Sequence, residues 1–359
     1  MIMKQKSICF LFPCFSYGPC GGFKVVYEYA NYLASKGYEV TIVYPGLYIP
    51  GNFSLLINIK KLLLYALYSS FKDFKQKWFN LDKRIKERKV PILNLKYVGD
   101  YDVYVATSVG TAIHLNEFKI PLHKKFYFIQ GFENWYVSES VLRSTYRYGF
   151  KNIVVSDWLA EEVRKSKADC TVIKNGFDFE YFKLYHKIED RDRLHISMLN
   201  HVDKNKGCKY GIEALELVKQ KYPALKATLF GYPQRDKNIP NWIEYYQAPD
   251  KKTHNEIYNN SSIYLAPSLQ EGWGLTVGEA MICGAAVVCT DTKGFREMVT
   301  DGESGLMVPI KNSEALAEAI ISLIEDNERR IKLAKNGVKA ISNFSWEKSF
   351  VQFEKLIES

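Results

Sequence analysis

The sequence lacks the cysteine spacing of a structural metal site or a redox pair. Its seven cysteines are scattered along 359 residues and odd in number, and none belongs to a CxxC pair. Disulfide frameworks and zinc ribbons need paired cysteines. We therefore expect reduced thiols in a cytoplasmic protein, without structural zinc.

Long apolar runs are missing as well. No segment approaches the roughly 20 apolar residues that a membrane helix requires. Near the start, Lys4 and Lys6 precede an apolar run, but Pro13 ends it before it reaches the length of a signal-peptide core. A first buried strand is the better interpretation of this run.

Positive charge is in excess. The formal net charge is +9, with 25% charged and 47% hydrophobic residues, a composition typical of a soluble globular protein. The positive balance suits an anionic ligand, a nucleic acid or an acidic membrane surface. No nucleic-acid-binding motif is present, so we expect no such partner. The length predicts two domains.

Strands and helices alternate in both halves of the chain. A turn at 16–22 and a helix at 23–36 follow the first strand, and a second series begins near His195. This order predicts βαβ units and parallel sheets. The polar stretch 177–193 is the expected linker between two doubly wound domains. The expected strands are 8–12, 39–44, 103–107, 125–129, 152–155, 170–173, 195–199, 227–230, 243–246, 263–266, 286–290 and 305–308.

The segment 58–89 departs from this alternation. It interleaves ten lysines and arginines with leucines and aromatic residues. A basic amphipathic helix with interfacial aromatics can lie on an anionic membrane. The alternative is a helix packed on the sheet with a solvated basic face, and periodicity alone does not separate the two.

The stretch 267–291 carries the clearest chemical signal. It follows an apolar strand and places Glu271 and Glu279 on either side of a turn opened by Gly272 and Gly274. Glycines let backbone amides approach a ligand closely, and a helix N-terminus near Leu275 offers unpaired donors and partial positive charge. This combination predicts a diphosphate site, with a carboxylate for a hydroxyl-rich group at each end. A nucleotide-sugar has these features.

This stretch resembles the signature of the retaining glycosyltransferases of family four, which have the GT-B fold. The resemblance continues through 294–299 and 301–309, and more loosely through Gly21-Gly22, 154–159, 172–178 and 344–347. It implies two Rossmann-like domains facing a central cleft, with a C-terminal helix crossing back to the first domain. The implied boundaries are 1–180 (acceptor-binding), 181–340 (nucleotide-sugar-binding) and 341–359 (returning helix).

The resemblance also implies roles for individual residues. Glu279 would bind the ribose and Glu271 a donor-sugar hydroxyl, while Lys206 would flank the leaving diphosphate. His201 stands where the family has an arginine, so a neutral imidazole with one N–H donor replaces a charged guanidinium that can form two hydrogen bonds at once. The expected donor-binding residues are Gly21, Gly22, Lys206, Glu271, Gly272, Trp273, Gly274, Leu275, Thr276 and Glu279.

The acceptor side departs from the family pattern. Gln130 occupies the place of a frequent histidine, with Glu133 close behind. The alternative for both residues is a polar loop that satisfies its own backbone. A subset that transfers rhamnose to surface polysaccharides looks similar here and at 198–201. The expected catalytic residues are Lys206, His201, Glu271, Gln130 and Glu133.

The expected reaction is sugar transfer from a nucleotide-diphosphate-sugar to a hydroxyl of a glycan or lipid-linked acceptor, in cell-surface polysaccharide synthesis. No DxD-like pair stands where it would chelate a metal to the phosphates, so no metal or cofactor is expected. The expected location is the cytoplasm, with the inner membrane face as the alternative. Competing hypotheses are an epimerase or phosphorylase on the same fold, and a non-catalytic nucleotide-sugar-binding partner.

Overall fold

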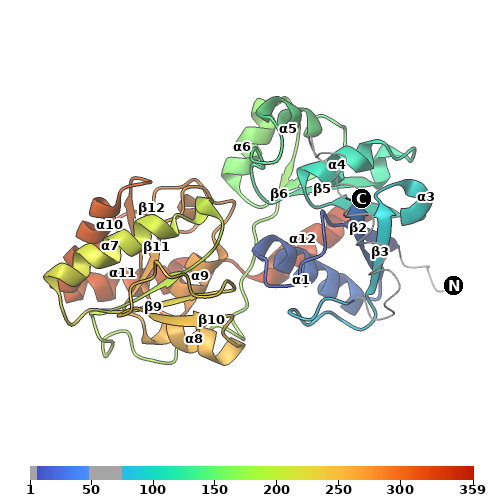
Figure 1. Ribbon diagram of the computed structural model, residues 1–359. Helices are drawn as coiled ribbons and strands as arrows, with labels where there is room; N and C mark the ends of the chain where they lie inside the picture. The colour runs from blue at the N-terminus through green and yellow to red at the C-terminus, as the bar shows by residue number, and fades with distance from the viewer. Residues whose placement is uncertain (1–5, 48–74) are drawn as a thin grey trace. The chain divides into compact units, whose positions relative to one another are not determined.

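The computed structural model describes residues 6–47 and 75–359, which form two compact units (Figure 1). The first unit extends to Lys174 and also includes Ser349–Ser359, and the second is Asn175–Lys348. Each unit contains a sheet of parallel strands packed with helices, so the predicted α/β class with two Rossmann-like domains is confirmed.

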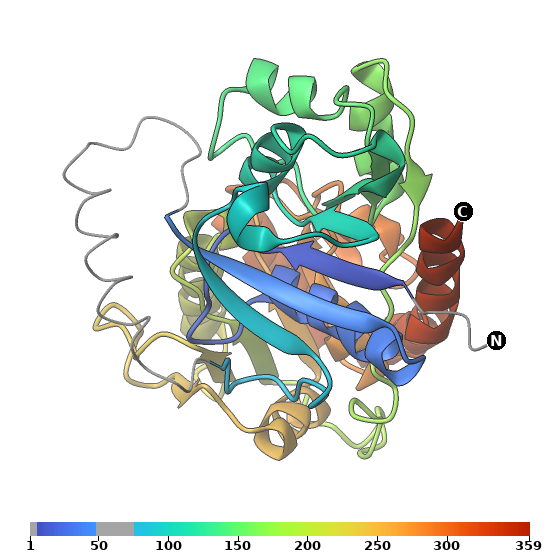
Figure 2. The ribbon, with the colours of Figure 1, turned by 90° about the vertical axis from the view of Figure 1, so that its right-hand side faces the viewer.

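The first unit contains a seven-stranded sheet in the order β3-β2-β1-β4-β5-β6-β7 (Figure 2). The chain leaves β1 toward β2 and returns to β4 on the other side. The carboxyl ends of β1 and β4 therefore form the switch point where open α/β sheets bind ligands. The strands are β1 (Ser7–Leu11), β2 (Glu39–Leu47), β3 (Lys86–Ile92), β4 (Val103–Ala106), β5 (Lys125–Ile129), β6 (Lys151–Val154) and β7 (Thr171–Val172).

Helices cover this sheet because its central strands are apolar throughout. Every residue of β4 and β5 is buried, as expected for strands with helices on both faces. The helices of the first unit are α1 (Gly21–Ser35), α3 (Leu95–Val98), α4 (Val109–Asn116), α5 (Glu139–Thr145) and α6 (Asp157–Lys165), with a 3-10 turn at Leu122–Lys124.

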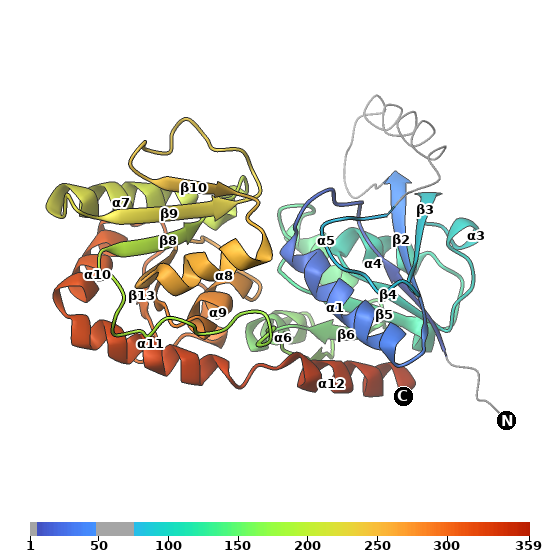
Figure 3. The same cartoon turned by 90° about the horizontal axis from the view of Figure 1, so that it is seen from below.

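The last helix, α12 (Trp346–Glu358), returns to the first unit and runs beside α1 (Figure 3). Its Phe353 ring lies 4.7 Å from Tyr29 and 6.3 Å from Phe10, and Phe350 stacks on Tyr32 at 4.7 Å. The predicted return of the terminal helix is confirmed, and aromatic packing holds it there.

The second unit contains a six-stranded sheet in the order β10-β9-β8-β11-β12-β13. Its switch point lies between β8 and β11, which pair in parallel. The strands are β8 (His195–Leu199), β9 (Lys226–Gly231), β10 (Glu244–Gln247), β11 (Ile263–Ala266), β12 (Ala286–Thr290) and β13 (Leu306–Val308). The helices are α7 (Cys208–Lys221), α8 (Lys251–Asn260), α9 (Leu275–Ile282), α10 (Ser313–Glu325) and α11 (Asn327–Ile341), with 3-10 turns at Lys204–Lys206 and Phe295–Glu297.

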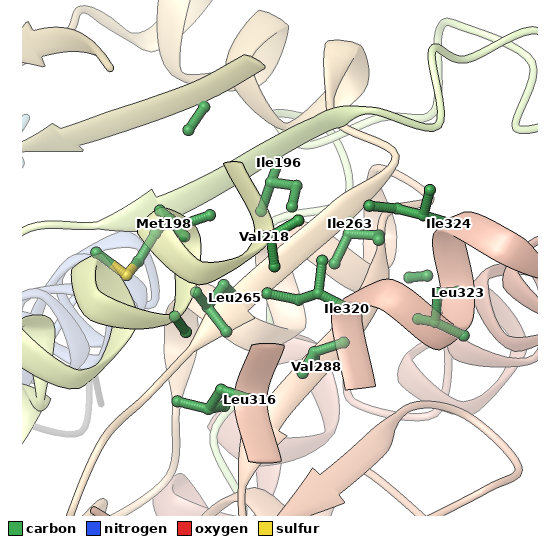
Figure 4. Close-up of a cluster of buried hydrophobic side chains, with 14 of the residues drawn as sticks. Ile196, Met198, Val218, Ile263, Leu265, Val288, Leu316, Ile320, Leu323 and Ile324 are labelled. Atoms are coloured by element: carbon green, nitrogen blue, oxygen red, sulfur yellow. The ribbon is translucent and has the colours of Figure 1, made fainter. Parts of the chain in front are cut away.

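Branched aliphatic side chains fill the space between this sheet and its helices (Figure 4). Ile196, Ile263 and Val288 from three neighbouring strands meet Leu316 and Ile320 of α10, and all five are fully buried. Burial of each such side chain contributes about 1.5–3 kcal/mol. This core fixes the strand ends from which the loops of the second unit extend.

The predicted basic helix at 58–89 is wrong for its last part. Residues 58–74 lie outside the described residues, residues 75–85 form neither helix nor strand, and Lys86–Lys89 begin β3. β3 is an edge strand that pairs only with β2 in the described sheet. The exposed Lys86 and Arg88 alternate with the half-buried Glu87 and Lys89, which suits an edge strand with one solvated face.

The stretch 177–193, expected as the linker, lies within the second unit. Phe177, Phe182 and Ile188 are buried there. Arg191 donates hydrogen bonds to the carbonyl oxygens of Ser261 and Cys283. Because the stretch 177–193 is polar overall, its sequence does not reveal these contacts, which attach it to α8 and α9.

Candidate active site

The predicted diphosphate loop follows β11 and lies at the switch point of the second sheet. Residues 267–274 connect β11 to α9, and residues 200–207 connect β8 to α7. The two loops touch, since the Leu269 amide donates to the carbonyl of Asn205 at 2.7 Å. The carboxyl ends of neighbouring strands thus bring two separate parts of the sequence to one edge.

Gly207 is what allows this contact. Its φ is +61°, and a Cβ at this position would overlap the carbonyl oxygen of Pro267. Only glycine combines the left-handed conformation with so little volume. The glycine after Lys206 therefore has a structural role, which is to let the first loop approach the second.

Lys206 and Glu271 form the centre of the candidate site. The Lys206 ammonium donates to Oε1 of Glu271 at 2.7 Å, and the Ser268 hydroxyl donates to the same oxygen at 2.7 Å. The Lys206 side chain is 28% exposed and that of Glu271 10%, so the pair is partly shielded from water. Burial acts to lower the pKa of Lys206, but attraction to Glu271 outweighs it and raises that pKa. Lys206 is thus a fixed positive charge at neutral pH.

The first turn of α9 lies beside this pair in the sequence. Gly274 is its N-cap with φ +104°, and no side chain caps this end among the residues that the structure describes. An added Cβ at Gly274 would lie 2.7 Å from the Phe295 ring. An eight-residue helix with an uncapped start presents backbone donors and partial positive charge, beginning with Leu275 and Thr276.

Trp273, one of the predicted donor-binding residues, has its side chain in the interior. The residue is 4% exposed, and its ring meets that of Phe344 edge to face, with centroids 5.3 Å apart. Its indole nitrogen is buried and has no hydrogen-bond partner in the described chain. Trp273 packs the base of the loop.

Glu279 is a buried carboxylate in α9, 4% exposed. The Tyr258 hydroxyl donates to its Oε2 at 3.3 Å. One residue earlier, Gly278 lies so close to Phe177 that a Cβ would overlap the ring. Glu279 is therefore buried in a closely packed part of α9 and is not an ordinary surface residue.

His201 follows β8 and is half-buried. Its Nδ1 accepts a hydrogen bond from the Asp203 amide at 3.0 Å, so in the neutral ring the proton is on Nε2. Burial, and next the charge of Lys206, lower the pKa of His201. The ring is therefore neutral at pH 7, with Nε2–H as its donor.

The remaining predicted residues lie in the first unit. α1 begins at Gly21, and no side chain caps it within the described chain. The Gln130 amide nitrogen, just beyond β5, donates to the carbonyl of Gly22 at 3.0 Å. The structure thus brings Gly22 and Gln130 together, although 108 positions separate them.

Glu133 is held against the start of α4. Its carboxylate accepts a hydrogen bond from the amide of Val109, the first residue of that helix. Burial raises the pKa of Glu133 to about 7, and the Val109 bond opposes the shift. An acid with this pKa can hold or release a proton near neutral pH.

The predicted residues thus form two sets, one in each unit. Sequence reasoning missed Ser268 and Tyr258, which position the two glutamates. Ser268 lies inside the diphosphate loop and could have been named as a partner of Glu271. Tyr258 could not, because no spacing in the sequence connects α8 to α9. The second unit holds Lys206, His201, Glu271, Gly272, Trp273, Gly274, Leu275, Thr276 and Glu279, and the first unit holds Gly21, Gly22, Gln130 and Glu133.

Within residues 6–47 and 75–359, no three His, Cys, Asp or Glu side chains gather as metal ligands would. None of the helices in these same ranges has both the length and the apolar character needed to cross a bilayer.

Two family models match the two halves of the chain. Residues 20–181 match the model described as Glycosyltransferase Family 4, and residues 185–340 match Glycosyl transferases group 1. The chain is 24% identical over 237 residues to a phosphatidyl-myo-inositol mannosyltransferase of Mycolicibacterium smegmatis, covering 62% of this chain and 61% of that protein.

A second relative is the N,N'-diacetylbacillosaminyl-diphospho-undecaprenol alpha-1,3-N-acetylgalactosaminyltransferase of Campylobacter jejuni. It is 28% identical over 242 residues, with 60% of this chain and 62% of that protein covered. The matches thus span about three fifths of the length of these relatives.

Two solved structures share the fold over nearly the whole chain. Sucrose-phosphate synthase from Thermosynechococcus elongatus superposes with a TM-score of 0.72 at 18% identity, covering 99% of this chain and 98% of that one. Anabaena HepE in complex with UDP-glucose gives a TM-score of 0.72 at 16% identity, covering 99% and 100%. At these identities the likeness concerns the fold alone.

Proposed function

Since the chain consists of a Glycosyltransferase Family 4 domain followed by a Glycosyl transferases group 1 domain, we propose that it transfers a sugar from a nucleotide-diphosphate-sugar to a hydroxyl of a glycan or lipid-linked acceptor. The proposed reaction retains the anomeric configuration and uses no metal. The observation that carries the proposal is the Lys206–Glu271 pair, held at 2.7 Å beside the uncapped start of α9.

The donor diphosphate is the group that this site suits best. Negative charge grows on the diphosphate as the bond to the sugar breaks, and preorganised donors stabilise such charge most effectively in a shielded site. Lys206 supplies a fixed positive charge and His201 supplies Nε2–H. The α9 amides add partial positive charge without titrating. Together these groups replace the metal that other transferases use at the diphosphate.

The two glutamates suit the hydroxyl-rich ends of the donor. We assign Glu271 to a sugar hydroxyl, because Lys206 and Ser268 both donate to Oε1 and thereby fix its carboxylate. We assign Glu279 to the ribose, in line with its place one turn into α9. The Tyr258 hydroxyl donates a hydrogen bond to Glu279. Recognition by rigid carboxylates loses little side-chain entropy when the donor binds.

On the acceptor side, Gln130 and Glu133 are the candidate groups in the first unit. Glu133 has a pKa of about 7, which suits it to take the proton of the attacking hydroxyl at neutral pH. Gln130 holds Gly22 at the start of α1. The hydroxyl oxygen then bonds to the anomeric carbon and its proton passes to Glu133. The bond between the sugar and the nucleotide diphosphate breaks, and the nucleotide diphosphate departs.

The test is to incubate the protein with UDP-, GDP- and dTDP-sugars, with and without saccharide acceptors. The resemblance at 128–136 and 198–201 makes dTDP-rhamnose the first donor to try. We expect nucleotide diphosphate release that depends on acceptor, and a product that keeps the anomeric configuration of the donor by NMR. Epimerised donor without an acceptor, or tight nucleotide binding without any turnover, would contradict the proposal.

A further inference from the structure

The loop after Glu133 forms a hollow on the first unit that no predicted role explains. The hollow has a volume of about 560 Å³ and lies between α4, α5 and the turn that precedes α5. Its apolar lining comes from Ile113, Trp135, Tyr136, Val137 and Val141. The volume falls within the range of about 300–1,000 Å³ typical of small-molecule sites.

Two large aromatic side chains are exposed at this hollow. Trp135 is 52% exposed and Tyr136 50%, with ring centroids 6.2 Å apart. Single exposed rings are common on soluble proteins, whereas contiguous exposed apolar patches mark interaction surfaces, and these two rings are adjacent. The inner edge of the indole lies against the backbone, since a Cβ on Gly131 would be 3.5 Å from it. One edge of the indole thus lies beside Gly131, while the residue as a whole is more than half exposed.

Polar groups complete the lining. Asn134 supplies an amide, and Ser138 supplies a hydroxyl at the N-cap of α5, where it accepts from the Val141 amide. A pyranose ring has one face of C–H groups and a rim of hydroxyls. An indole with an amide and a hydroxyl beside it matches both features, since the C–H face packs on the ring and the rim forms hydrogen bonds.

The charges around the hollow favour a neutral sugar over a membrane. Between Gln130 and Val141 the sequence contains Glu133 and Glu139 but no lysine or arginine. The nearest cation along the chain, Arg143, is paired with Glu139 and Glu162, both at 2.7 Å. Anionic lipid surfaces attract basic segments, so this acidic turn is a poor membrane anchor even with its tryptophan.

The hollow also lies close to the candidate acceptor residues. Glu133 precedes Asn134 in the chain and contacts Val109, and Ile113 lies one turn further along α4. One helical turn is about 5.4 Å. The hollow and the contact between Glu133 and Val109 thus lie on successive turns of α4.

We propose that this hollow is a saccharide subsite, in which Trp135 stacks on a pyranose ring of the acceptor and Asn134 and Ser138 bind its hydroxyls. The inference rests on the proposed transferase function and adds the acceptor class, a glycan with at least one sugar beyond the reacting one. The same sugar can come from a free oligosaccharide or from a polyprenyl-diphosphate-linked one.

The first test measures binding without catalysis. The indole N–H of Trp135 is assigned in ¹⁵N NMR spectra by comparison with Trp135→Phe, and methyl pyranosides and disaccharides are titrated in. We expect the Trp135 signal to move with disaccharides, while the other five tryptophans stay in place. No movement with any saccharide of the panel would overturn the subsite, whether or not the chain is a transferase.

The second test measures transfer with Trp135→Ala, Trp135→Phe and the control Tyr97→Ala, which removes a 43% exposed ring on α3. We expect the acceptor KM to rise roughly tenfold for Trp135→Ala, less for Trp135→Phe, and not for the control. Hydrolysis of the donor without acceptor should be unchanged. Free and polyprenyl-linked acceptors are run in parallel, and loss with the linked form alone identifies the lipid-linked source.

Two outcomes separate the subsite from the function on which it rests. An unchanged acceptor KM in a working enzyme would overturn the subsite and leave the transferase intact. No turnover with any donor would end the proposed function, and the NMR titration would still decide the subsite. Loss of binding to phosphatidylglycerol vesicles by Trp135→Ala, with the acceptor KM unchanged, would identify a membrane anchor and overturn the proposal.

Discussion

The ammonium nitrogen of Lys206 lies 2.7 Å from Oε1 of Glu271, although 65 positions separate the two residues in the sequence. The pairing of β8 with β11 makes this contact, since each residue follows one of these strands. Because Glu271 raises the pKa of Lys206, the lysine keeps its positive charge at neutral pH, and this ammonium is the group proposed to meet an incoming anion.

Removing that charge tests the proposed mechanism. We expect Lys206→Ala to lower kcat about 100-fold, the usual loss when one donor to a developing anion is removed, with a smaller change in donor KM. The matched control is Lys209→Ala, which removes an exposed lysine 3.7 Å from Glu213. Steady-state kinetics of both variants provide the measurement. Equal turnover in the two would remove Lys206 from the mechanism.

Glu279→Gln tests ribose recognition. The amide keeps the shape of the buried side chain and its contact with Tyr258 but accepts fewer hydrogen bonds from hydroxyls. We expect donor affinity to fall roughly tenfold, measured by calorimetry with UDP, GDP and dTDP, while kcat changes little. Glu256→Gln, on the exposed face of α8, should leave affinity unchanged. A loss of the same size in the deoxyribose and ribose nucleotides would instead place Glu279 on the 3′-hydroxyl.

Gly207→Ala tests the contact between the two loops. A Cβ costs about 1–2 kcal/mol of backbone strain in the left-handed region, and at Gly207 it also overlaps Pro267. Gly302 has φ +72° with nothing within 4 Å of an added Cβ, so Gly302→Ala isolates the strain. Urea unfolding should show a loss for Gly207→Ala that exceeds the control by about 2 kcal/mol or more. Losses of equal size would contradict the overlap.

The pH dependence of stability tests Glu133. Its pKa is about 7 in the folded protein, against a usual value of 4.5. Between these values the unfolded chain has released the proton that the folded chain still holds, so stability falls as pH rises from 4.5 to 7 and then levels off. Glu133→Gln removes this term. The free energy of unfolding of Glu133→Gln minus that of the parent should therefore increase from pH 5 to pH 8, by a few kcal/mol at most. A gain that is the same at both pH values would show that Glu133 titrates normally.

Much of the fold could be predicted from the sequence because its central strands are apolar runs with polar ends. The bounds predicted for β8, β11 and β12 agree residue for residue with the structure. β3 was missed because Lys86–Lys89 are charged, and an edge strand with one solvated face has no apolar run to reveal it.

The candidate site, like the fold, could be predicted from the sequence only in part. The glycine turn and its two glutamates could be identified locally, because each has a defined place relative to a strand and a helix. The burial of Trp273 and the bond from Tyr258 to Glu279 could not, since both depend on how α8, α9 and the 344 region pack. A single loop can be interpreted from its own sequence, but contacts between loops can be predicted only when the order of the strands in the sheet is known.

The position of α12 has a consequence for the order of synthesis. Phe10, Tyr29 and Tyr32 are made early, yet the rings that cover them, Phe350 and Phe353, are translated only after the whole second unit. The first unit cannot complete its core while the ribosome is still working, although amino-terminal domains usually fold first. A nonsense mutation before the codon of Phe350 would therefore leave Phe10, Tyr29 and Tyr32 without these rings, so that a complete second unit would be joined to a first unit with an incomplete core.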